Sequence, residues 1–318
     1  MTGSESGEKK KSMSENKFMG LNKTQEKKFP VKNKALAVLG SPGSGKTTTS
    51  IKLALELAKH KKNAVVVFCD PFTSVLPYVT SAGTAVETSL GTLLTAPGIT
   101  QTDILKACVP IGQTEYVSYL GYRAGENLMA YPKVTRDKAV DFFVMLRHLA
   151  DFVIIDCSTI FEADPVSIVG IETADTALRL GTSNLKGIAY YQTHMPMLAD
   201  SVFHVDKHYK AISMLKPWQE WEAVSQQYGG VKYTLPYVTE LEQQYDEVSL
   251  PDLLKSRESL KYTAEIKRIV GDVFGIGDNP ADAGQKAAQK AGQSEDSRKT
   301  TRGAISFKLP FGKSKGEF

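Results

Sequence analysis

The sequence predicts an α/β protein with a doubly wound, mostly parallel β-sheet flanked by helices, and with disordered tails. Short apolar runs typical of buried strands alternate with longer stretches whose apolar residues recur at helical spacing. Strands separated by helices of this length pair in parallel, because each connection has to return across the sheet. The chain has 318 residues, 42% of them hydrophobic and 23% charged, which is enough to bury a sizeable core.

The chain's first predicted unit is a strand, a glycine-rich turn, a helix and a second strand. Residues 35–39 form an apolar run that ends at the turn, and apolar residues between 51 and 57 follow at helical spacing. Residues 64–68 form the next apolar run. This order predicts a βαβ unit.

The remaining elements continue the alternation. We expect further strands at residues 116–120, 152–155, 176–180, 211–215 and 231–235. We expect helices at residues 102–108, 136–149, 165–171, 185–198, 218–228 and 252–274. The last of these helices closes the domain.

Composition changes divide the chain into four parts. Residues 1–33 lack periodic apolar positions and are rich in lysine, so we expect a disordered basic leader. Residues 34–276 form one folded domain. Residues 277–301, composed mainly of Ala, Gln, Gly, Lys and Asp, are expected to be a flexible linker before a basic, aromatic tail at 302–318.

The net charge of +4 is unevenly distributed. Residues 1–34 carry nine lysines and four glutamates, and residues 277–318 carry eight basic and five acidic side chains, which leaves −4 for the segment between them. A mildly acidic core argues against a surface built for nucleic acid, so DNA binding is the less favoured expectation.

Cysteine content and hydropathy indicate the compartment. The three cysteines, Cys69, Cys108 and Cys157, form no C-x-x-C pair and no disulfide framework. The sequence contains no apolar stretch of about 18 residues and no apolar signal region. We therefore expect a cytoplasmic protein, with peripheral contact at the inner face of the membrane as an alternative.

A phosphate-binding motif lies between the first strand and the first helix. G-x-x-x-x-G-K-[ST] is matched by Gly40, Ser41, Pro42, Gly43, Ser44, Gly45, Lys46 and Thr47. The glycines let backbone N–H groups surround a phosphate, Lys46 reaches the β- and γ-phosphates, and the Thr47 hydroxyl ligates Mg²⁺. Thr48, the next residue at the start of the helix, is included among the nucleotide-binding residues. The sequence thus predicts ATP and Mg²⁺ as ligands of a P-loop ATPase domain.

Two carboxylates follow strands that neighbour this motif. Asp156 ends an apolar run and is the candidate Walker B ligand of Mg²⁺, although an aspartate can simply end a strand. Asp70 is followed by Pro71; it either terminates a turn or positions the attacking water and contributes to the metal site. An Asn-Lys-x-Asp element typical of guanine recognition is absent from the sequence, which favours ATP.

These residues resemble the MinD/ParA group of deviant-Walker P-loop ATPases, in the SIMIBI class. The resemblance covers residues 35–275 and rests on the P-loop, Asp70-Pro71, Ile154-Ile155-Asp156, and Leu235-Pro236-Tyr237 with Glu240 and Val248. A finer similarity to the TadZ/CpaE-like branch rests on Ser89-Leu90-Gly91-Thr92-Leu93-Leu94, Asp103-Ile104-Leu105, Tyr119-Leu120-Gly121-Tyr122 and Tyr131-Pro132.

The sequence departs from the group's pattern at three places. Ser41 stands where the group usually has a signature lysine that reaches a dimer partner's nucleotide, and Phe68 replaces a usual aspartate. Cys157-Ser158-Thr159 follows the Walker B strand where other residues are usual. By resemblance, the adenine is expected near the loop after residues 211–215 and near Pro236.

The resemblance implies a slow ATPase, with Lys46 and Asp70 catalytic, that positions or regulates a secretion, pilus, conjugation or partition assembly. It implies a nucleotide-dependent homodimer and protein partners. The alternatives are an ATP-binding adaptor without catalysis and a ParA-type DNA-partitioning ATPase. The tail at residues 302–318 alternates apolar and basic side chains, which suits an anionic membrane surface or a groove on a partner protein.

Overall fold

The structure is a computed structural model of the chain, and it describes residues 34–80, 86 and 88–277. The predicted leader at 1–33 and the tail at 302–318 lie outside these residues. The predicted linker at 277–301 also lies outside them, apart from Gly277. Apart from Gly277, the described residues fall within the segment 34–276 that is predicted to be the folded domain.

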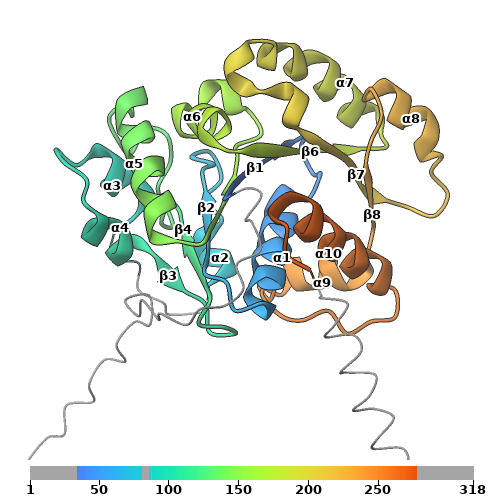
Figure 1. Cartoon of the computed structure of the whole chain (residues 1–318), viewed down its shortest axis with the longest axis horizontal. Coiled ribbons are helices and arrows are strands. Elements are labelled where there is room, and N and C mark those ends of the chain that lie inside the picture. Colours follow the sequence, from blue (N-terminus) through green and yellow to red (C-terminus); the bar gives the residue numbers. More distant parts are fainter. Residues whose placement is uncertain (1–33, 81–85, 87, 278–318) are drawn as a thin grey trace, which may run out of the picture. The chain divides into compact units, whose positions relative to one another are not determined.

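The described part of the chain contains an eight-stranded sheet (Figure 1). Its strands are β1 (Ala35–Gly40), β2 (Ala64–Phe68), β3 (Val109–Pro110), β4 (Val117–Leu120), β5 (Phe152–Asp156), β6 (Thr176–Thr182), β7 (Tyr209–Leu215) and β8 (Tyr233–Pro236). They lie in the order β3-β4-β2-β5-β1-β6-β7-β8. Every neighbouring pair is parallel except β3 and β4. The predicted mostly parallel sheet is therefore confirmed.

Helices cover both faces of the sheet (Figure 1). They are α1 (Lys46–Lys59), α2 (Leu76–Val79), α3 (Leu90–Thr95), α4 (Gln101–Ala107), α5 (Arg136–Leu149), α6 (Pro165–Thr173), α7 (Leu185–His194), α8 (Trp221–Gln227), α9 (Thr239–Asp246) and α10 (Leu260–Phe274). In Figure 1, α1 and α10 lie on one face and α5, α6 and α7 on the other. This arrangement confirms the doubly wound fold.

The alternation of side chains along each strand creates a separate core on each face. In β1, Leu36 and Val38 join the buried cluster that α1 and α10 cover. Ala37 and Leu39, between and after them, point into the cluster covered by α3 to α6. Because both faces are covered, the central strands are apolar at nearly every position, which is the pattern from which they could be predicted.

Several short elements were not expected from the sequence. These are β3, α2, α3 and α9, which have two to eight residues and too few turns for periodicity to reveal them. The helix expected to start at residue 252 begins at Leu260 instead. Glu240 accepts hydrogen bonds from the backbone N–H groups of Lys255 and Ser256, so these amides are bonded to a side chain rather than within a helix.

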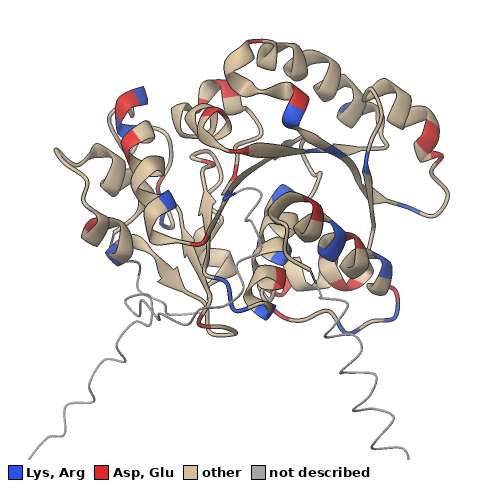
Figure 2. Ribbon diagram, in the orientation of Figure 1, with Lys and Arg blue, Asp and Glu red and all other residues tan. Residues whose placement is uncertain are grey.

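Charged residues are spread over the outer helices of the described part of the chain. Lys, Arg, Asp and Glu are interspersed on outer helices such as α5 and α10 (Figure 2). No helix in residues 34–80 or 88–277 is both long and apolar enough to cross a membrane.

The sheet order determines where the site lies. β1 is central, between β5 and β6, and β2 pairs with the other edge of β5. Parallel strands end at the same edge, so the loops after β1, β2 and β5 meet there. The P-loop, Asp70 and Asp156 are brought together in this way although more than a hundred residues separate the first from the last.

Candidate functional site

The loop after β1 takes its shape from close packing and left-handed glycines. A Cβ on Gly40 would lie 2.1 Å from the carbonyl oxygen of Leu180 in β6, so only glycine fits there. The Ser41 N–H donates to that same oxygen at 3.2 Å. Gly43 and Gly45 have φ of 68° and 72°, a region that glycine adopts without strain. The loop therefore turns sharply from the strand into α1.

The first turn of α1 leaves its backbone N–H groups open to a ligand. Gly45 occupies the N-cap position and has no side chain to accept from these donors. The first turn also contains no acidic residue. Because the N-terminus of a helix carries partial positive charge, this turn is a ready site for a phosphate.

The Lys46 side chain folds across the loop and is hydrogen-bonded there. Its Nζ donates to the carbonyl of Gly40 at 3.2 Å and to Thr159 Oγ1 at 2.7 Å. Burial lowers the pKa of Lys46, while the nearby carboxylates of Asp156 and Asp70 act in the opposite direction. Sequence reasoning missed Thr159, whose signal was its position in the polar run just after β5.

Thr47 and Asp156 form the oxygen pair expected of a Mg²⁺ site. The Thr47 hydroxyl donates to Asp156 Oδ2 at 2.6 Å, and the Ser50 hydroxyl approaches Oδ1 at 3.5 Å. Asp156 is 5% exposed, and burial raises its pKa to about 6 against the opposing effects of Thr47 and Lys46. A buried carboxylate whose hydrogen-bonding side-chain partners are hydroxyls fits a hard divalent cation, which prefers oxygen ligands.

Asp70 forms a turn at the edge of the site, and its role toward an attacking water or a metal stays a prediction. Its Oδ1 accepts from the backbone N–H groups of Phe72 at 2.8 Å and Thr73 at 3.3 Å, as a turn residue does. The same carboxylate lines the cavity that contains Lys46 and Asp156. The turn thus fixes the carboxylate at the edge of the site.

A cavity of about 500 Å³ lies against the P-loop. Its polar lining includes Pro42, Gly43, Ser44, Gly45, Lys46, Thr47, Thr48, Asp70, Asp156 and Thr159. Its apolar lining includes Val75, Met214, Leu235, Val238, Leu241 and Tyr245. One cavity therefore combines an ammonium, hydroxyls and carboxylates with apolar side chains.

The apolar residues that line the cavity were only partly expected from the sequence. Pro236 ends β8, and the lining formed by the described residues includes its neighbours Leu235 and Val238 but not Pro236 itself. Met214 has φ of 54° at an irregularity in the pairing of β7 with β8, and its sulfur would lie 3.7 Å from a Cβ on Gly45. In this conformation the Met214 thioether lies against the P-loop. The residue type alone does not predict this contact.

β7 is also bonded directly to the P-loop. The hydroxyl of Ser213 donates to the carbonyl oxygen of Ser44 at 2.7 Å, and it is buried. This bond orients the middle of the loop from a strand that lies two places away from β1 in the sheet. Ser213 is a second positioning residue that the sequence did not indicate.

Buried hydroxyls without partners gather around this loop. Ser41 Oγ, Ser44 Oγ and Ser158 Oγ are buried and have no hydrogen-bond partner among the residues that the structure describes. Buried polar atoms are normally paired, so unpaired ones mark a place where a ligand can supply the partner. Ser41, which replaces the signature lysine, is 1% exposed and does not project from the loop.

Other ligand classes find less support. Nowhere in the described ranges do three His, Cys, Asp or Glu side chains gather as a metal site of their own. Cys69 and Cys157 are buried thiols, and burial raises the pKa of both. Among the described residues, this edge therefore offers an ammonium, hydroxyls, carboxylates and apolar side chains to a ligand.

Comparison with known proteins gives matches among solved structures alone. No protein-family model and no curated protein matches the chain. A ParA-family ATPase from Chlorobium tepidum TLS superimposes with a TM-score of 0.60 at 12% identity, covering 73% of this chain and 97% of its own. MinD from Pyrococcus horikoshii OT3, solved with Mg-ADP, has a TM-score of 0.55 at 16% identity over 76% of this chain and 99% of its own.

A third similar structure is apo McdA from Cyanothece, with a TM-score of 0.56 at 18% identity over 75% of this chain and 99% of its own. At such identities a structural match shows the fold. The resemblance to the MinD/ParA group is confirmed at that level, and the finer similarity to the TadZ/CpaE-like branch stays a prediction. This chain has the fold of the MinD/ParA-like P-loop ATPases.

Proposed function

We propose that this chain binds ATP with Mg²⁺, hydrolyses it slowly, and uses the nucleotide state to position or regulate a larger assembly. The observation that carries the proposal is the convergence of Lys46, Thr47 and Asp156 at the open N-terminus of α1. The solved structures of similar fold include MinD with Mg-ADP and a substituted McdA with ATP, which supports this choice of ligand.

Each residue has a physical task in this proposal. The P-loop N–H groups and Lys46 bind the phosphates, and Lys46 exchanges its bonds to Gly40 and Thr159 for phosphate oxygens. Mg²⁺, when bound, neutralises charge on the β- and γ-phosphates, and Thr47 and Asp156 are the residues that would hold it. Asp70, whose carboxylate is fixed by hydrogen bonds from the N–H groups of Phe72 and Thr73, orients the attacking water.

The apolar lining of the cavity is proposed to hold the adenine. Met214, Leu235 and Val238 offer apolar contact there. ATP is favoured because the guanine-specific element is absent from the sequence.

The slow turnover follows from the switch role that we propose. A nucleotide that is hydrolysed slowly keeps one conformation populated until the γ-phosphate leaves, which makes the reaction a timer. We propose a nucleotide-dependent homodimer and protein partners; a solved complex of MinC with MinD from Aquifex aeolicus, which shares this fold, supports the second point. We also propose a cytoplasmic location, with the tail at residues 302–318 as the contact for an anionic membrane.

A second candidate is an ATP-binding adaptor that does not hydrolyse. The observation that favours it is the burial of Ser41, which gives the P-loop no side chain able to reach a neighbouring molecule's nucleotide. If dimerisation through a signature lysine is needed for turnover, this chain lacks that device. The two candidates differ only in whether bound ATP is cleaved.

The test is ATP binding by calorimetry alongside release of labelled phosphate, with and without anionic liposomes or DNA. Binding with slow phosphate release supports the ATPase, and binding without release under any condition supports the adaptor. Stimulation by DNA that weakens steeply with salt would favour DNA partitioning instead. Absence of ATP binding would contradict all three.

A further inference from the structure

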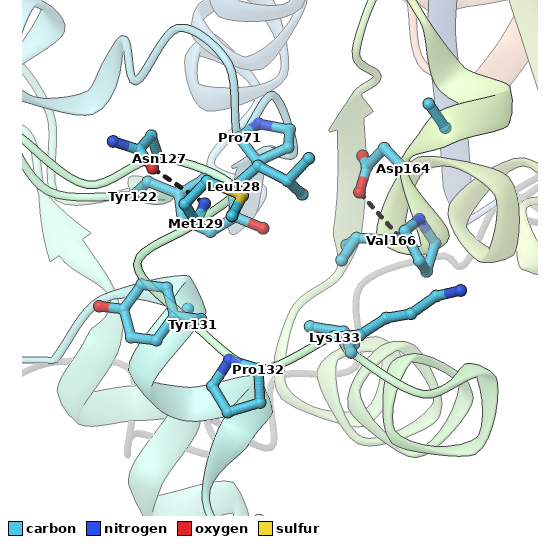
Figure 3. Close-up of a pocket in the computed structure, with 14 residues that line it drawn as sticks. Pro71, Tyr122, Asn127, Leu128, Met129, Tyr131, Pro132, Lys133, Asp164 and Val166 are labelled. Atoms are coloured by element: carbon cyan, nitrogen blue, oxygen red, sulfur yellow. Dashed lines mark hydrogen bonds between the residues drawn. The ribbon is translucent and has the colours of Figure 1, made fainter.

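A second pocket, of about 360 Å³, lies apart from the P-loop. We call it the 127–134 pocket, because residues 127–134 form one wall. The opposite wall is formed by residues 163–166, at the start of α6, and Pro71 lies at one corner (Figure 3). Neither Lys46 nor Thr47 contributes to it.

This pocket is built from the segments that leave the nucleotide site. Pro71 directly follows Asp70. Asp164 lies on the segment that runs from Asp156 at the end of β5 to α6. The chain therefore connects Asp70 and Asp156 to two parts of this pocket.

The 127–134 wall is held rigidly by Tyr131. Its ring lies flat on Gly91 of α3, where a Cβ would come within 2.1 Å of the ring. Its hydroxyl bonds to Ser89 Oγ at 2.9 Å and donates to Glu126 Oε1 at 2.5 Å. Glu126 also pairs with Arg123 at 2.6 Å. The residues in these contacts include members of the Ser89–Leu94 and Tyr131-Pro132 motifs, which take no part in the nucleotide site. Their contacts give the pocket a preformed shape.

The edge of the pocket exposes apolar side chains to solvent. Met129 is 89% exposed and Leu128 is 45% exposed, and the turn that carries them is fixed by the N–H of Met129 donating to Asn127 Oδ1 at 2.9 Å. A small molecule inside the cavity would leave this edge uncovered. Contiguous exposed apolar surface around a pocket is typical of a protein docking site.

The charges at the pocket select the partner. Asp164 is 2% exposed, and its two oxygens accept from the N–H groups of Val166 at 3.1 Å and Ser167 at 3.0 Å, so its charge is balanced by the start of α6. Lys133 is exposed at the rim (Figure 3), and no other described residue hydrogen-bonds or ion-pairs with its ammonium. The accessible charge is therefore positive, above an apolar interior.

We propose that the 127–134 pocket docks an acidic peptide segment of a protein partner, with a large apolar side chain seated in the pocket and a neighbouring carboxylate on Lys133. The apolar side chain supplies contact with Leu128 and Met129, and the carboxylate fixes its direction. The proposal of a docking site depends only on these contacts. Any effect of ATP on peptide binding depends in addition on the proposed function.

The test selects random seven-residue peptides displayed on phage against the whole chain, once with Mg-ATP and once without nucleotide. The enriched peptides are then synthesised and their affinity is measured by fluorescence anisotropy. We expect peptides that combine a Phe, Trp, Leu or Met with a nearby Asp or Glu. We expect binding to Met129→Ser and to Lys133→Glu to be about tenfold weaker, since each removes one anchor.

Matched variants separate docking from damage to the fold. Met197→Ser and Lys261→Glu change exposed residues of the same types away from the pocket, and they should bind the peptides as the unsubstituted chain does. All four variants should bind ATP equally by calorimetry. Loss of ATP binding by the unsubstituted chain would overturn the proposed function, while the selection without nucleotide would still decide the docking site.

Three results would overturn the inference. They are the absence of any enriched peptide under both conditions, enrichment of basic peptides, and enriched peptides whose affinity Met129→Ser and Lys133→Glu leave unchanged. Light scattering gives a fourth. A change in oligomeric state caused by Met129→Ser without peptide would identify a second copy of the chain as the occupant.

Discussion

Helix α1 uses two lysines, half-buried Lys46 and buried Lys52, in opposite ways. At its first turn, Lys46 donates to one carbonyl and one hydroxyl, in a cavity where neighbouring serine hydroxyls have no partner among the described residues. In its middle, Lys52 donates at 2.7–2.8 Å to Gln244 Oε1 and to the carbonyl oxygens of Leu250 and Asp252. Burial lowers the pKa of both lysines, that of Lys52 to about 8.

The difference teaches how to separate a structural charge from a functional one. An ammonium has three N–H donors, and Lys52 satisfies all three within the fold, so it fixes the segment after α9 against α1. Lys46 is bonded to partners that it can release, beside a carboxylate and an open helix end. A buried charge with a complete set of partners stabilises the fold, whereas one with an incomplete set is available to a ligand.

The largest expected effect is on ATP affinity. Lys46→Ala should weaken ATP binding by about 1000-fold, because it removes a charged donor to the phosphates. The free energy of unfolding should stay the same or rise, since a poorly compensated buried charge is lost. Calorimetry and urea unfolding measure the two quantities, with Lys261→Ala on the exposed side of α10 as the control. A large loss of stability with unchanged ATP affinity would reverse the roles of the two lysines.

The next effect is on turnover. Asp70→Ala should lower the rate of phosphate release by about 100-fold while ATP affinity changes by less than about threefold, because Asp70 acts on water rather than on the phosphates. Single-turnover phosphate release measures the rate, and calorimetry measures the ATP affinity. The turn made by Asp70 is also lost, so Asp70→Asn, which keeps an acceptor for the N–H groups of Phe72 and Thr73, is the conservative variant. Turnover at the unsubstituted rate in Asp70→Asn would remove Asp70 from the reaction.

The structural lysine should affect stability. Lys52→Met keeps the apolar stem but leaves three acceptors, two of them buried, without a donor, so the free energy of unfolding should fall by about 2 kcal/mol. Urea unfolding measures this. Lys59→Met, on the same helix, breaks an ion pair with Glu56 at a 47% exposed side chain and should change stability by less than about 0.5 kcal/mol. Equal effects of the two substitutions would show that the acceptors of Lys52 are satisfied by water.

Sequence predicted the region of Lys46 and not that of Lys52. The P-loop and the strand ending at Asp156 could be predicted because spacing and residue type carry their chemistry. Lys52 occupies an ordinary helix position, and its acceptors lie about 200 residues away, in α9 and in the segment that follows it. The same holds for Thr159, Ser213 and Met214, whose roles come from how loops and strand ends meet. Motifs identify local chemistry, whereas tertiary contacts decide the rest.

A third basic side chain, that of half-buried His208, extends the comparison to pH. Its Nε2 lies 2.8 Å from the carbonyl of Phe203, and its Nδ1 is buried with no partner among the described residues. Burial, reinforced by the nearby charge of Arg179, lowers the pKa of His208 to about 4. Unlike Lys52, this side chain has no acceptor for the proton that would charge it, so the folded chain keeps it neutral.

The free energy of unfolding should therefore decrease as the pH falls from about 6.5 to 4, because the unfolded chain takes up the proton at the ordinary pKa near 6.5 and the folded chain does not. Below pH 4 both states are protonated and this contribution levels off. His208→Gln keeps a donor to Phe203 without the titration, and its loss of stability between pH 7 and 4.5 should be smaller by about 1–2 kcal/mol. Urea unfolding at several pH values measures the difference, with exposed His148→Gln as the control. Identical pH profiles for His208→Gln and the unsubstituted chain would mean that His208 finds an acceptor for its second proton. His208 would then have a complete set of hydrogen-bond partners, as Lys52 does, and the comparison between them would fail.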